Sequence, residues 1–376
     1  MATKKKSNRS APLGIGVIGC GLMGDIHADC YTRNRNSRVV ATHNRTHAKA
    51  VALAEKYGGT ACADINELLA NPAVDAVAIC SPQVVHHKQI VAAARAGKHI
   101  FCEKPVALTA AELDDAEAVV AKHKVTFMTG HQMRLHPIIT AVQKAMPRLG
   151  PIYHVDFEWC FRIDAHEGRC WESYRQGGFF MELGCHAADL AGYLLGKVVH
   201  VSGHTLRLNP KRITEDYTNV LLQFESGAVA QILVSANHRT KRQGLLLGRV
   251  LGARGRIDFT VYPYKRTLNE ATLTIDYGKK LFVADTKTTK LRIPDLPSRS
   301  EVYPGFFDVY DRQAAAFIKS VQTGTPPPCT LADGRQAIEV VLATYHTQNQ
   351  ATRTQNFAKR PKRYLSNTDS HPLLSD

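Results

Sequence analysis

The chain has 376 residues, and its 48 Lys and Arg against 33 Asp and Glu give a formal net charge of +15. With 44% hydrophobic and 22% charged residues, the composition excludes a mainly disordered chain. The length suits two domains with cores of ordinary size. No apolar run approaches the roughly 20 residues of a membrane-spanning helix, so we expect no membrane partner.

The net charge and the cysteines indicate which partners, metals and cellular location to expect. A basic surface could favour an anionic substrate or a phosphorylated cofactor, but no nucleic-acid-binding motif accompanies the charge, so we expect no nucleic-acid partner. The nine cysteines are scattered without a C-x-x-C pair, which favours reduced thiols and no metal. Glycines at 14 and 16 interrupt the apolar start too early for a signal peptide, so we expect a cytoplasmic location.

Short apolar runs alternate with helical patterns in the first third of the chain. Because the runs lack polar alternation, we expect strands covered on both faces, spaced by helices around a parallel sheet. The expected strands are 15–18, 38–42, 76–80, 100–102 and 126–129, and the expected helices are 25–31, 48–57, 65–70, 86–96 and 110–123.

The pattern changes after about residue 137. Residues 153–159 alternate as in a strand with one buried face. Glycine turns predict three hairpins, and two helices close the chain. The result is a large, mainly antiparallel sheet with one open face, which favours a homo-oligomer, dimer or tetramer, through that face. The hairpins join 219–224 to 228–234, 245–251 to 256–261 and 273–277 to 280–283, and the helices are 306–322 and 331–351.

These patterns predict an α/β protein with a Rossmann domain followed by an α/β domain on an open-faced sheet. We expect four segments: a basic flexible tail at 1–12, a nucleotide-binding domain at 13–133, a substrate-binding and oligomerisation domain at 134–358, and a tail at 359–376.

A glycine-rich loop follows the first expected strand and opens a helix, as in dinucleotide-binding folds. Its glycines would let the backbone turn tightly and approach a pyrophosphate at the helix N-terminus. The loop is Gly19, Cys20, Gly21, Leu22, Met23 and Gly24.

The position that reads the ribose lies at the end of the second strand and holds Asn44 and Arg45 instead of an acid. Without a carboxylate there, nothing repels a 2′-phosphate and Arg45 could pair with it, which favours NADP over NAD. Alternatively, Arg45 stacks on adenine while NAD is bound.

Two further strand ends should face the cofactor crevice. Ser81 and Pro82 follow the third run, with His86 at the next helix start; alone, His86 favours packing over catalysis. Glu103 and Lys104 precede Pro105 after the fourth run. A cis X-Pro bond could aim Lys104 inward, where a desolvated ammonium can have a lowered pKa and handle protons.

A second cluster follows the glycine pair Gly177-Gly178. On the expected helix, Glu182 and His186 are four residues apart and Asp189 lies three further on, so all three lie near one face. A carboxylate beside a histidine raises its basicity, so this pattern predicts a general acid/base pair. The alternative is a surface acid and a core histidine.

These blocks together resemble the Gfo/Idh/MocA oxidoreductases, the relatives of glucose–fructose oxidoreductase and inositol 2-dehydrogenase. The resemblance extends over roughly residues 13–352. It rests on the glycine loop, Glu103-Lys104-Pro105, the block from Gly177 to Asp189, the segment 130–137 and the C-terminal segment 327–335.

The resemblance implies NAD(P) and hydride transfer at a carbohydrate or polyol carbon. It implies that Lys104 polarises the hydroxyl and that His186 accepts the proton, with Glu182 as its partner where the family usually has Asp. Gln132 would lie near the nicotinamide ribose, and Arg134 would point toward the cleft or tie the domains together. The resemblance makes Arg162, His166 and Trp171 candidate sugar contacts, with ordinary loop packing as the alternative.

Two other functions remain open on the sequence. The same site could cleave glycosides through transient NAD-dependent oxidation and elimination, with no net reduction of the cofactor. A non-catalytic nucleotide sensor is less favoured because Lys104 and His186 are both present.

Overall fold

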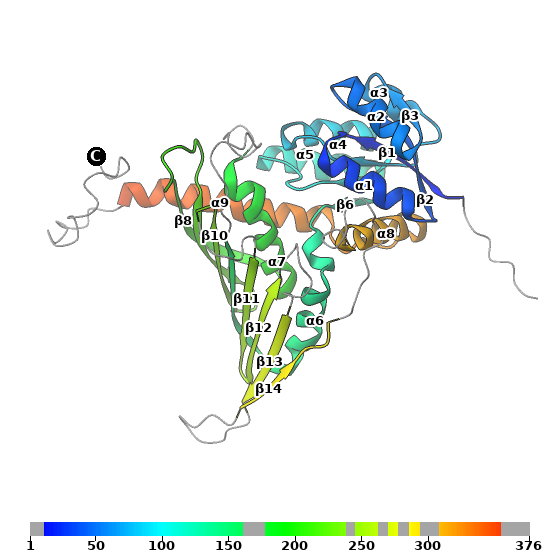
Figure 1. The fold of residues 1–376 in the computed structure, drawn as a ribbon. Helices are drawn as coiled ribbons and strands as arrows, with labels where there is room; N and C mark the ends of the chain where they lie inside the picture. Colours follow the sequence, from blue (N-terminus) through cyan, green and yellow to red (C-terminus); the bar gives the residue numbers. More distant parts are fainter. Residues whose placement is uncertain are drawn as a thin grey trace, which may run out of the picture.

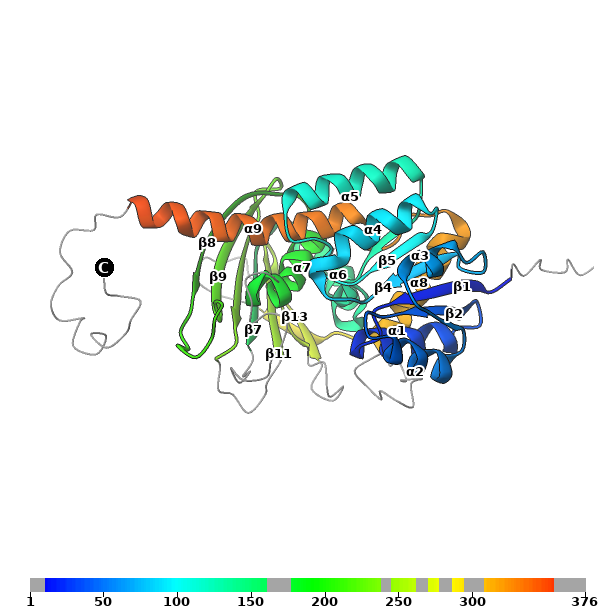
Figure 2. The same cartoon turned by 90° about the horizontal axis from the view of Figure 1, so that it is seen from above.

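The computed structural model describes residues 11–160, 177–237, 245–261, 270–276, 286–293 and 308–354. The chain forms two α/β halves, each built on one sheet, with the long helix α9 (Leu331–Thr354) running alongside both (Figures 1 and 2). None of the helices in these ranges is long and apolar enough to cross a membrane.

The first half is a six-stranded parallel sheet in the order β3-β2-β1-β4-β5-β6. The order reverses between β1 and β4, and the carboxyl ends of strands at such a point form the nucleotide crevice of doubly wound sheets. The strands are β1 (Leu13–Ile18), β2 (Ser37–His43), β3 (Thr60–Cys62), β4 (Ala76–Ile79), β5 (His99–Cys102) and β6 (Phe127–Thr129).

Helices cover both faces of this sheet. One of them, α8 (Asp308–Thr323), comes from the far end of the chain and packs against α1, with Tyr310 and Phe317 in the same core as β1. The other elements of this half are α1 (Leu22–Arg33), α2 (His47–Tyr57), α3 (Ile65–Ala70), η1 (Gln83–Val85), α4 (His86–Arg95), α5 (Ala110–His123) and η2 (Gln132–Leu135).

The second half is an eight-stranded sheet in the order β14-β13-β12-β11-β7-β10-β9-β8, antiparallel except for the parallel pair β7–β10. Its strands are β7 (Ile152–Cys160), β8 (Val198–Leu206), β9 (Tyr217–Phe224), β10 (Val229–Ser235), β11 (Leu245–Gly252), β12 (Gly255–Val261), β13 (Glu270–Asp276) and β14 (Thr286–Lys290).

One face of the large sheet is covered and the other is open. The covered face packs against α6 (Pro137–Ala145), α7 (Cys185–Leu195) and α9, and it holds the largest apolar core. A 3₁₀ turn, η3 (Met146–Leu149), follows α6, and a π-helical turn, η6 (Phe180–Gly184), leads into α7. On the open face Leu221, Gln231, Leu247 and Arg249 are exposed.

The structure confirms the fold class and most expected elements. The hairpins β9–β10 and β11–β12 form as predicted. The expected partner strand at 280–283 lies outside the described residues, and β13 pairs with β14 instead. The sequence patterns missed β3, β8 and β14.

Candidate functional site

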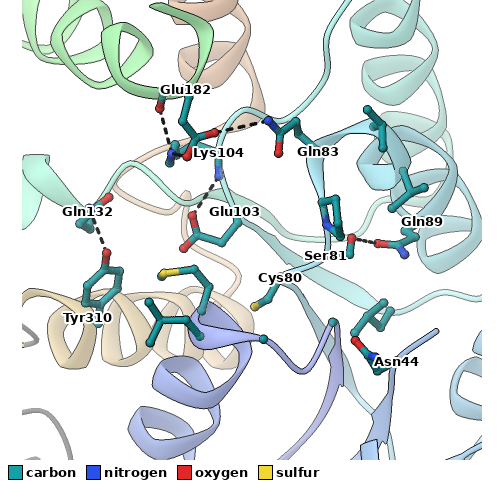
Figure 3. A pocket seen from close by; sticks show the side chains of 18 of the residues that line it. Asn44, Cys80, Ser81, Gln83, Gln89, Glu103, Lys104, Gln132, Glu182 and Tyr310 are labelled. Atoms are coloured by element: carbon teal, nitrogen blue, oxygen red, sulfur yellow. Dashed lines mark hydrogen bonds and ion pairs between the residues drawn. The ribbon is translucent and has the colours of Figure 1, made fainter. Parts of the chain in front are cut away.

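A pocket of about 720 Å³ lies between the two halves, at the carboxyl ends of β1 and β4. The first half supplies the glycine loop and the loops after β2, β4 and β5, and the second half supplies side chains from η6, α7 and the large sheet. Figure 3 shows polar side chains from several of these loops pointing into this space.

The glycine loop has the backbone of a pyrophosphate cradle. Gly19 has φ +96° and packs so closely on the backbone of Ser81 that a Cβ there would lie 2.5 Å from the Ser81 nitrogen. A Cβ on Gly24 would lie 2.0 Å from the Gly19 oxygen, so the helix start also needs glycine. By contrast, a Cβ on Gly21 would meet nothing within 4 Å, and Gly21 lines the pocket.

Helix α1 begins at this loop, and its N-cap residue, Gly21, has no side chain that could cap the first turn. Its first N–H groups are therefore available to an anion. Together with the open space at Gly21, this end of the pocket fits a dinucleotide. Leu22 and Met23 line the pocket, whereas Cys20 is not among its lining residues.

The end expected to read the ribose is rich in donors and cations. Asn44 accepts from the Cys20 N–H at 3.1 Å and donates to the Thr46 oxygen at 3.0 Å, so its amide joins the two loops. Arg45 and Lys49 are exposed and line the pocket. Lys49 was missed by the sequence analysis; its position four residues after Arg45, on a helix start, was the available signal.

Ser81 and Pro82 line the pocket, but His86 does not. The His86 ring is 1% exposed and lies between two carbonyl oxygens, with Nδ1 2.8 Å from the Pro105 oxygen and Nε2 2.7 Å from the Ser81 oxygen. Burial lowers its pKa. His86 was predicted to contact the cofactor; its contacts instead join the two loops that follow β4 and β5.

Glu103 lines the pocket and is buried, with 5% of its surface exposed. Its Oε1 is 2.7 Å from Nε2 of the buried His27, and its Oε2 accepts from the Lys104 N–H at 3.2 Å. Burial opposes the charge of this carboxylate, but His27 and Lys104 outweigh burial and lower its pKa. Nearby, the Gln132 amide donates to the Tyr310 hydroxyl at 3.1 Å (Figure 3).

Lys104 reaches across the pocket to the second half, and its peptide bond to Pro105 is cis. Its Nζ donates to Oε1 of Glu182 at 2.6 Å and to the Glu182 carbonyl oxygen at 2.9 Å. Burial alone would lower the pKa of Lys104, but the Glu182 carboxylate raises it above its usual value. The expectation of a lowered pKa was therefore wrong, and Lys104 is a permanent cation at neutral pH.

The predicted pair of Glu182 and His186 does not form. The Glu182 carboxylate contacts Lys104 and, at 3.4 Å, the Gln83 amide. Residues 180–184 form a π-helical turn, in which residues four apart are not stacked as they are in an α-helix. The charge of Lys104 then determines where the carboxylate points (Figure 3).

His186 lines the pocket from the first turn of α7. Its ring centroid is 5.5 Å from that of His131 and 5.6 Å from that of Trp159. Burial, followed by the charge of Lys104, lowers the pKa of His186 well below its usual value. The ring is therefore neutral at neutral pH and able to accept a proton.

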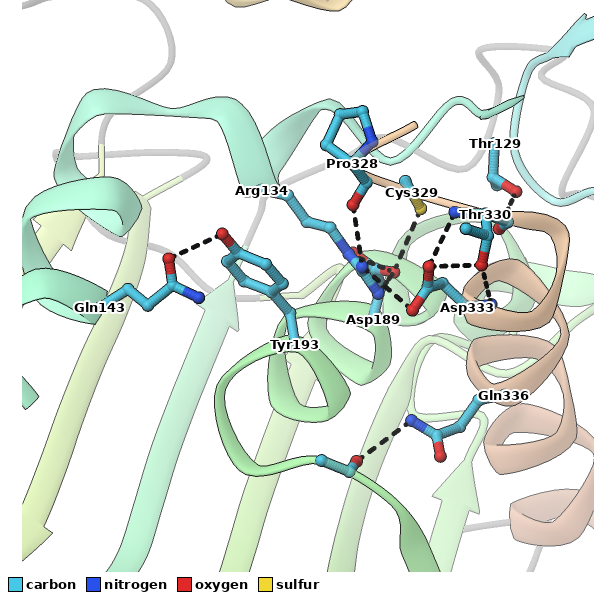
Figure 4. Close-up of polar contacts among 11 residues, drawn as sticks. Thr129, Arg134, Gln143, Asp189, Tyr193, Pro328, Cys329, Thr330, Asp333 and Gln336 are labelled. Atoms are coloured by element: carbon cyan, nitrogen blue, oxygen red, sulfur yellow. Dashed lines mark hydrogen bonds and ion pairs between the residues drawn. The ribbon is translucent and has the colours of Figure 1, made fainter. Parts of the chain in front are cut away.

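Arg134 and Asp189 lie apart from the pocket lining, at the junction of the two halves. Asp189 is fully buried, and its Oδ1 is 2.7 Å from Nη2 of Arg134. Arg134 also donates to the Pro328 oxygen and pairs with Asp333 (Figure 4). Of the two roles expected for Arg134, the structure shows the one that ties the domains together. The remaining candidates, Arg162, His166 and Trp171, lie outside the described residues.

Comparison with known proteins gives the family. Residues 13–131 match the domain described as "Oxidoreductase family, NAD-binding Rossmann fold", and residues 147–355 match the corresponding C-terminal alpha/beta domain. The chain belongs to the Gfo/Idh/MocA oxidoreductase family.

Its relatives include dehydrogenases of inositol. The chain is 29% identical to a myo-inositol 2-dehydrogenase of Thermotoga maritima, over 86% of this chain and 92% of the relative. It is 33% identical to an inositol 2-dehydrogenase of Rhizobium meliloti, over 60% of this chain and 68% of the relative. A levoglucosan dehydrogenase solved with NADH and levoglucosan shares the fold, with a TM-score of 0.78 at 21% identity over 90% of this chain and 98% of the other.

Proposed function

We propose that this protein oxidises a secondary alcohol of a sugar, polyol or glycoside, or reduces the matching ketone, with Lys104 and His186 at the reacting carbon. The observation that carries the proposal is the arrangement of these two side chains in one pocket: a permanent cation and a neutral imidazole. The relatives named as inositol dehydrogenases support the same class of substrate.

The Lys104 ammonium has three N–H donors. Two of its acceptors are the oxygens of Glu182, which leaves one donor for the substrate hydroxyl. A cation there stabilises the alkoxide that forms as the proton leaves. Glu182 thus holds Lys104 in place and keeps it charged.

His186 accepts the hydroxyl proton in the oxidation direction and returns it in the reduction direction. The bound nicotinamide supplies the hydride acceptor or donor. The glycine loop and the α1 N-terminus would hold its pyrophosphate, and Gln132, Glu103 and Tyr310 line the same pocket as Lys104.

We further propose that NADP is preferred over NAD. Arg45 and Lys49 both line the ribose end of the pocket, and both are exposed. Two cations favour a 2′-phosphate. The test is the ratio of the dissociation constants of the two cofactors: Arg45→Ala with Lys49→Ala should weaken NADP⁺ binding and leave NAD⁺ binding little changed. Equal weakening of both would reject the preference.

We also propose a homo-oligomer, dimer or tetramer, through the open face of the large sheet, in a cytoplasmic protein. Leu221 and Leu247 are exposed there. Light scattering should give a mass above that of one chain, and Leu247→Glu should reduce it. A monomeric native protein would reject the assembly.

The main experiment measures the nucleotide released from the denatured protein and then the reduction of added NAD(P)⁺ with sugars and polyols. Net reduction that is lost in both Lys104→Met and His186→Ala, with nucleotide binding intact, supports the dehydrogenase. Tightly held NAD(H) at one per chain with glycoside cleavage and no net reduction would replace it with the redox-neutral reaction. Nucleotide binding without turnover of any substrate would favour a non-catalytic nucleotide sensor.

A further inference from the structure

Two side chains of the second half bind the backbone at the start of the π-helical turn η6. Glu215 lies in the loop between β8 and β9 and is 3% exposed, and Tyr345 lies on α9. The Tyr345 hydroxyl donates to Oε1 of Glu215 at 2.6 Å, and we call the two residues the Glu215–Tyr345 pair. Neither is among the residues that line the pocket. Any effect of the pair on a substrate must therefore pass through the backbone that it binds.

The pair binds N–H groups where the helical segment begins. This segment starts at Gly178, so Phe180 lies in its first turn, where N–H groups have no carbonyl partner within the helix. Oε1 of Glu215 accepts from the Phe180 N–H at 2.8 Å. The Tyr345 oxygen accepts from the Met181 N–H at 3.3 Å. A carboxylate also suits the positive end of a helix, so the pair anchors two consecutive residues of η6.

The two glycines before η6 fit the chain to the pair. Gly178 has φ +84°, and a Cβ there would lie 2.6 Å from Oε2 of Glu215. Only glycine lets the backbone approach this carboxylate so closely. The Tyr345 hydroxyl lies 2.9 Å from the Gly177 oxygen. The pair therefore fixes the chain immediately before η6 as well as within it.

The same turn binds Lys104. Glu182 follows Met181 directly, and it accepts from the Lys104 ammonium through its carbonyl oxygen at 2.9 Å and its Oε1 at 2.6 Å. One of these two contacts comes from the backbone, so the position of the turn helps to decide where the ammonium lies. The turn leads directly into α7, which carries His186. A shift of η6 would therefore change the position of Lys104 relative to His186.

We propose that the Glu215–Tyr345 pair positions Glu182, and through it the Lys104 ammonium, to hydrogen-bond the substrate hydroxyl. This inference rests on the proposed dehydrogenase function and adds two positioning residues to it. The pair links α9 and the loop before β9 to the reacting group. Misplacement of a reacting group by about 1 Å can cost on the order of a hundredfold in rate, so a small shift of η6 would be measurable.

Variants of the pair measure the effect on kcat. Tyr345→Phe removes only the hydroxyl, and kcat should fall about 10-fold because η6 loses the bond at Met181. Glu215→Leu should lower kcat at least as much. Glu215→Gln keeps an acceptor for the Phe180 N–H and should restore most of the native kcat. The dissociation constant of the cofactor should stay near its native value in all three, because the first half supplies the glycine loop.

The residue before Tyr345 on α9 provides a matched control. The buried Thr344 hydroxyl donates to the Val340 oxygen at 2.8 Å, within the same helix. Thr344→Val therefore removes a buried hydroxyl from α9 without removing a bond to η6. It should lower the melting temperature and leave kcat unchanged. A fall in kcat equal to that of Tyr345→Phe would show a general effect of loosening α9 and would overturn the positioning role.

A double variant tests whether the pair acts through Lys104. If it does, Tyr345→Phe should cause little further loss of kcat in a Lys104→Met protein, because the group that the pair positions is already gone. Losses of kcat that multiply in the double variant would mean that the pair acts elsewhere, and they overturn the proposal.

A measurement without substrate separates this proposal from the dehydrogenase. Acetic anhydride at about pH 9 reacts only with neutral lysine, and mass spectrometry compares Lys104 with the exposed Lys144 of α6 as an internal reference. A Lys104 held less closely by Glu182 is less protonated, so its relative rate should rise several-fold in Tyr345→Phe and stay native in Thr344→Val.

The two readouts give distinct outcomes. A faster reaction of Lys104 in Tyr345→Phe, with no turnover of any alcohol by the native protein, supports the positioning of Lys104 and overturns the dehydrogenase. A native rate of the Lys104 reaction, or a native kcat, in Tyr345→Phe overturns the positioning role. The pair is then only a helix cap, and the dehydrogenase stands.

Discussion

Two ion pairs connect the first half of the molecule to the segment that carries η6 and α7. They differ in whether the cation keeps a hydrogen-bond donor free for a substrate. In the first, the Lys104 ammonium gives two of its three donors to Glu182 and faces the pocket. In the second, the Arg134 guanidinium meets Asp189, Asp333 and the Pro328 oxygen, away from the pocket lining (Figure 4). A pair with a spare donor beside a cavity can bind substrate, whereas a saturated buried pair fixes the domains.

Removal of the two cations should therefore have different effects: loss of Lys104 should lower activity, and loss of Arg134 should lower stability. Lys104→Met should lower kcat by about a thousandfold, because it removes the donor that stabilises the developing alkoxide. Glu182 is 15% exposed in its side chain and borders the pocket, so water can solvate it and the melting temperature should change little. Steady-state kinetics and calorimetric melting of the same preparation measure both.

Arg134→Met should mainly affect stability. Removing it leaves the fully buried Asp189 carboxylate without its partner, and we expect the free energy of unfolding to fall by about 3–5 kcal/mol. Denaturant titration measures the loss, and the double variant Arg134→Met with Asp189→Leu should recover part of it because no buried charge remains. A stable Arg134→Met protein with a Lys104-like loss of kcat would reverse the assignment of the two pairs.

Glu182→Gln tests whether the carboxylate keeps Lys104 charged. The amide retains a hydrogen bond but removes the charge that raises the pKa of Lys104. That pKa should therefore fall. The alkaline decline of kcat should therefore begin at lower pH in the variant than in the native enzyme. If kcat declines at the same alkaline pH in the variant and the native enzyme, Glu182 only positions Lys104.

The pH dependence of oxidation should also report His186. Its pKa is held well below the usual value by burial and by Lys104, so the neutral, proton-accepting form persists into mildly acidic solution. The acid limb of kcat/KM should therefore lie below the roughly pH 6.5 of an ordinary histidine. An acid limb at or above that value would exclude a base in this environment.

A feature of this molecule could be predicted from the sequence where its signal is local, and not where it depends on distant residues. Five of the six parallel strands were found because their buried apolar runs carry a local signal. The three-residue β3 (Thr60–Cys62) is only partly buried and β14 (Thr286–Lys290) is fully exposed, so neither carries that signal. The glycine loop, Lys104 and His186 were identified from local motifs, and the structure gathers them at one pocket. The partners of Glu182 and Arg134 depend on a π-helical turn and on residues 55 or more positions away, which spacing cannot reveal.

Substitution of Asp333, the partly exposed partner of Arg134, should have the smallest effect on stability. Burial would raise the pKa of its carboxyl, but the Thr330 hydroxyl and Arg134 outweigh burial and lower it. A carboxyl with a lowered folded pKa stabilises the protein above its unfolded pKa and loses that contribution as the pH falls through the folded value. The native protein should therefore be more stable than Asp333→Asn at pH 6, and this difference should shrink below about pH 4. Because a third of the Asp333 side chain is exposed, solvent screens its charge, and the difference should stay well below that of Arg134→Met. A loss as large as that of Arg134→Met would mean that Asp333, not Asp189, is the main anchor of the arginine.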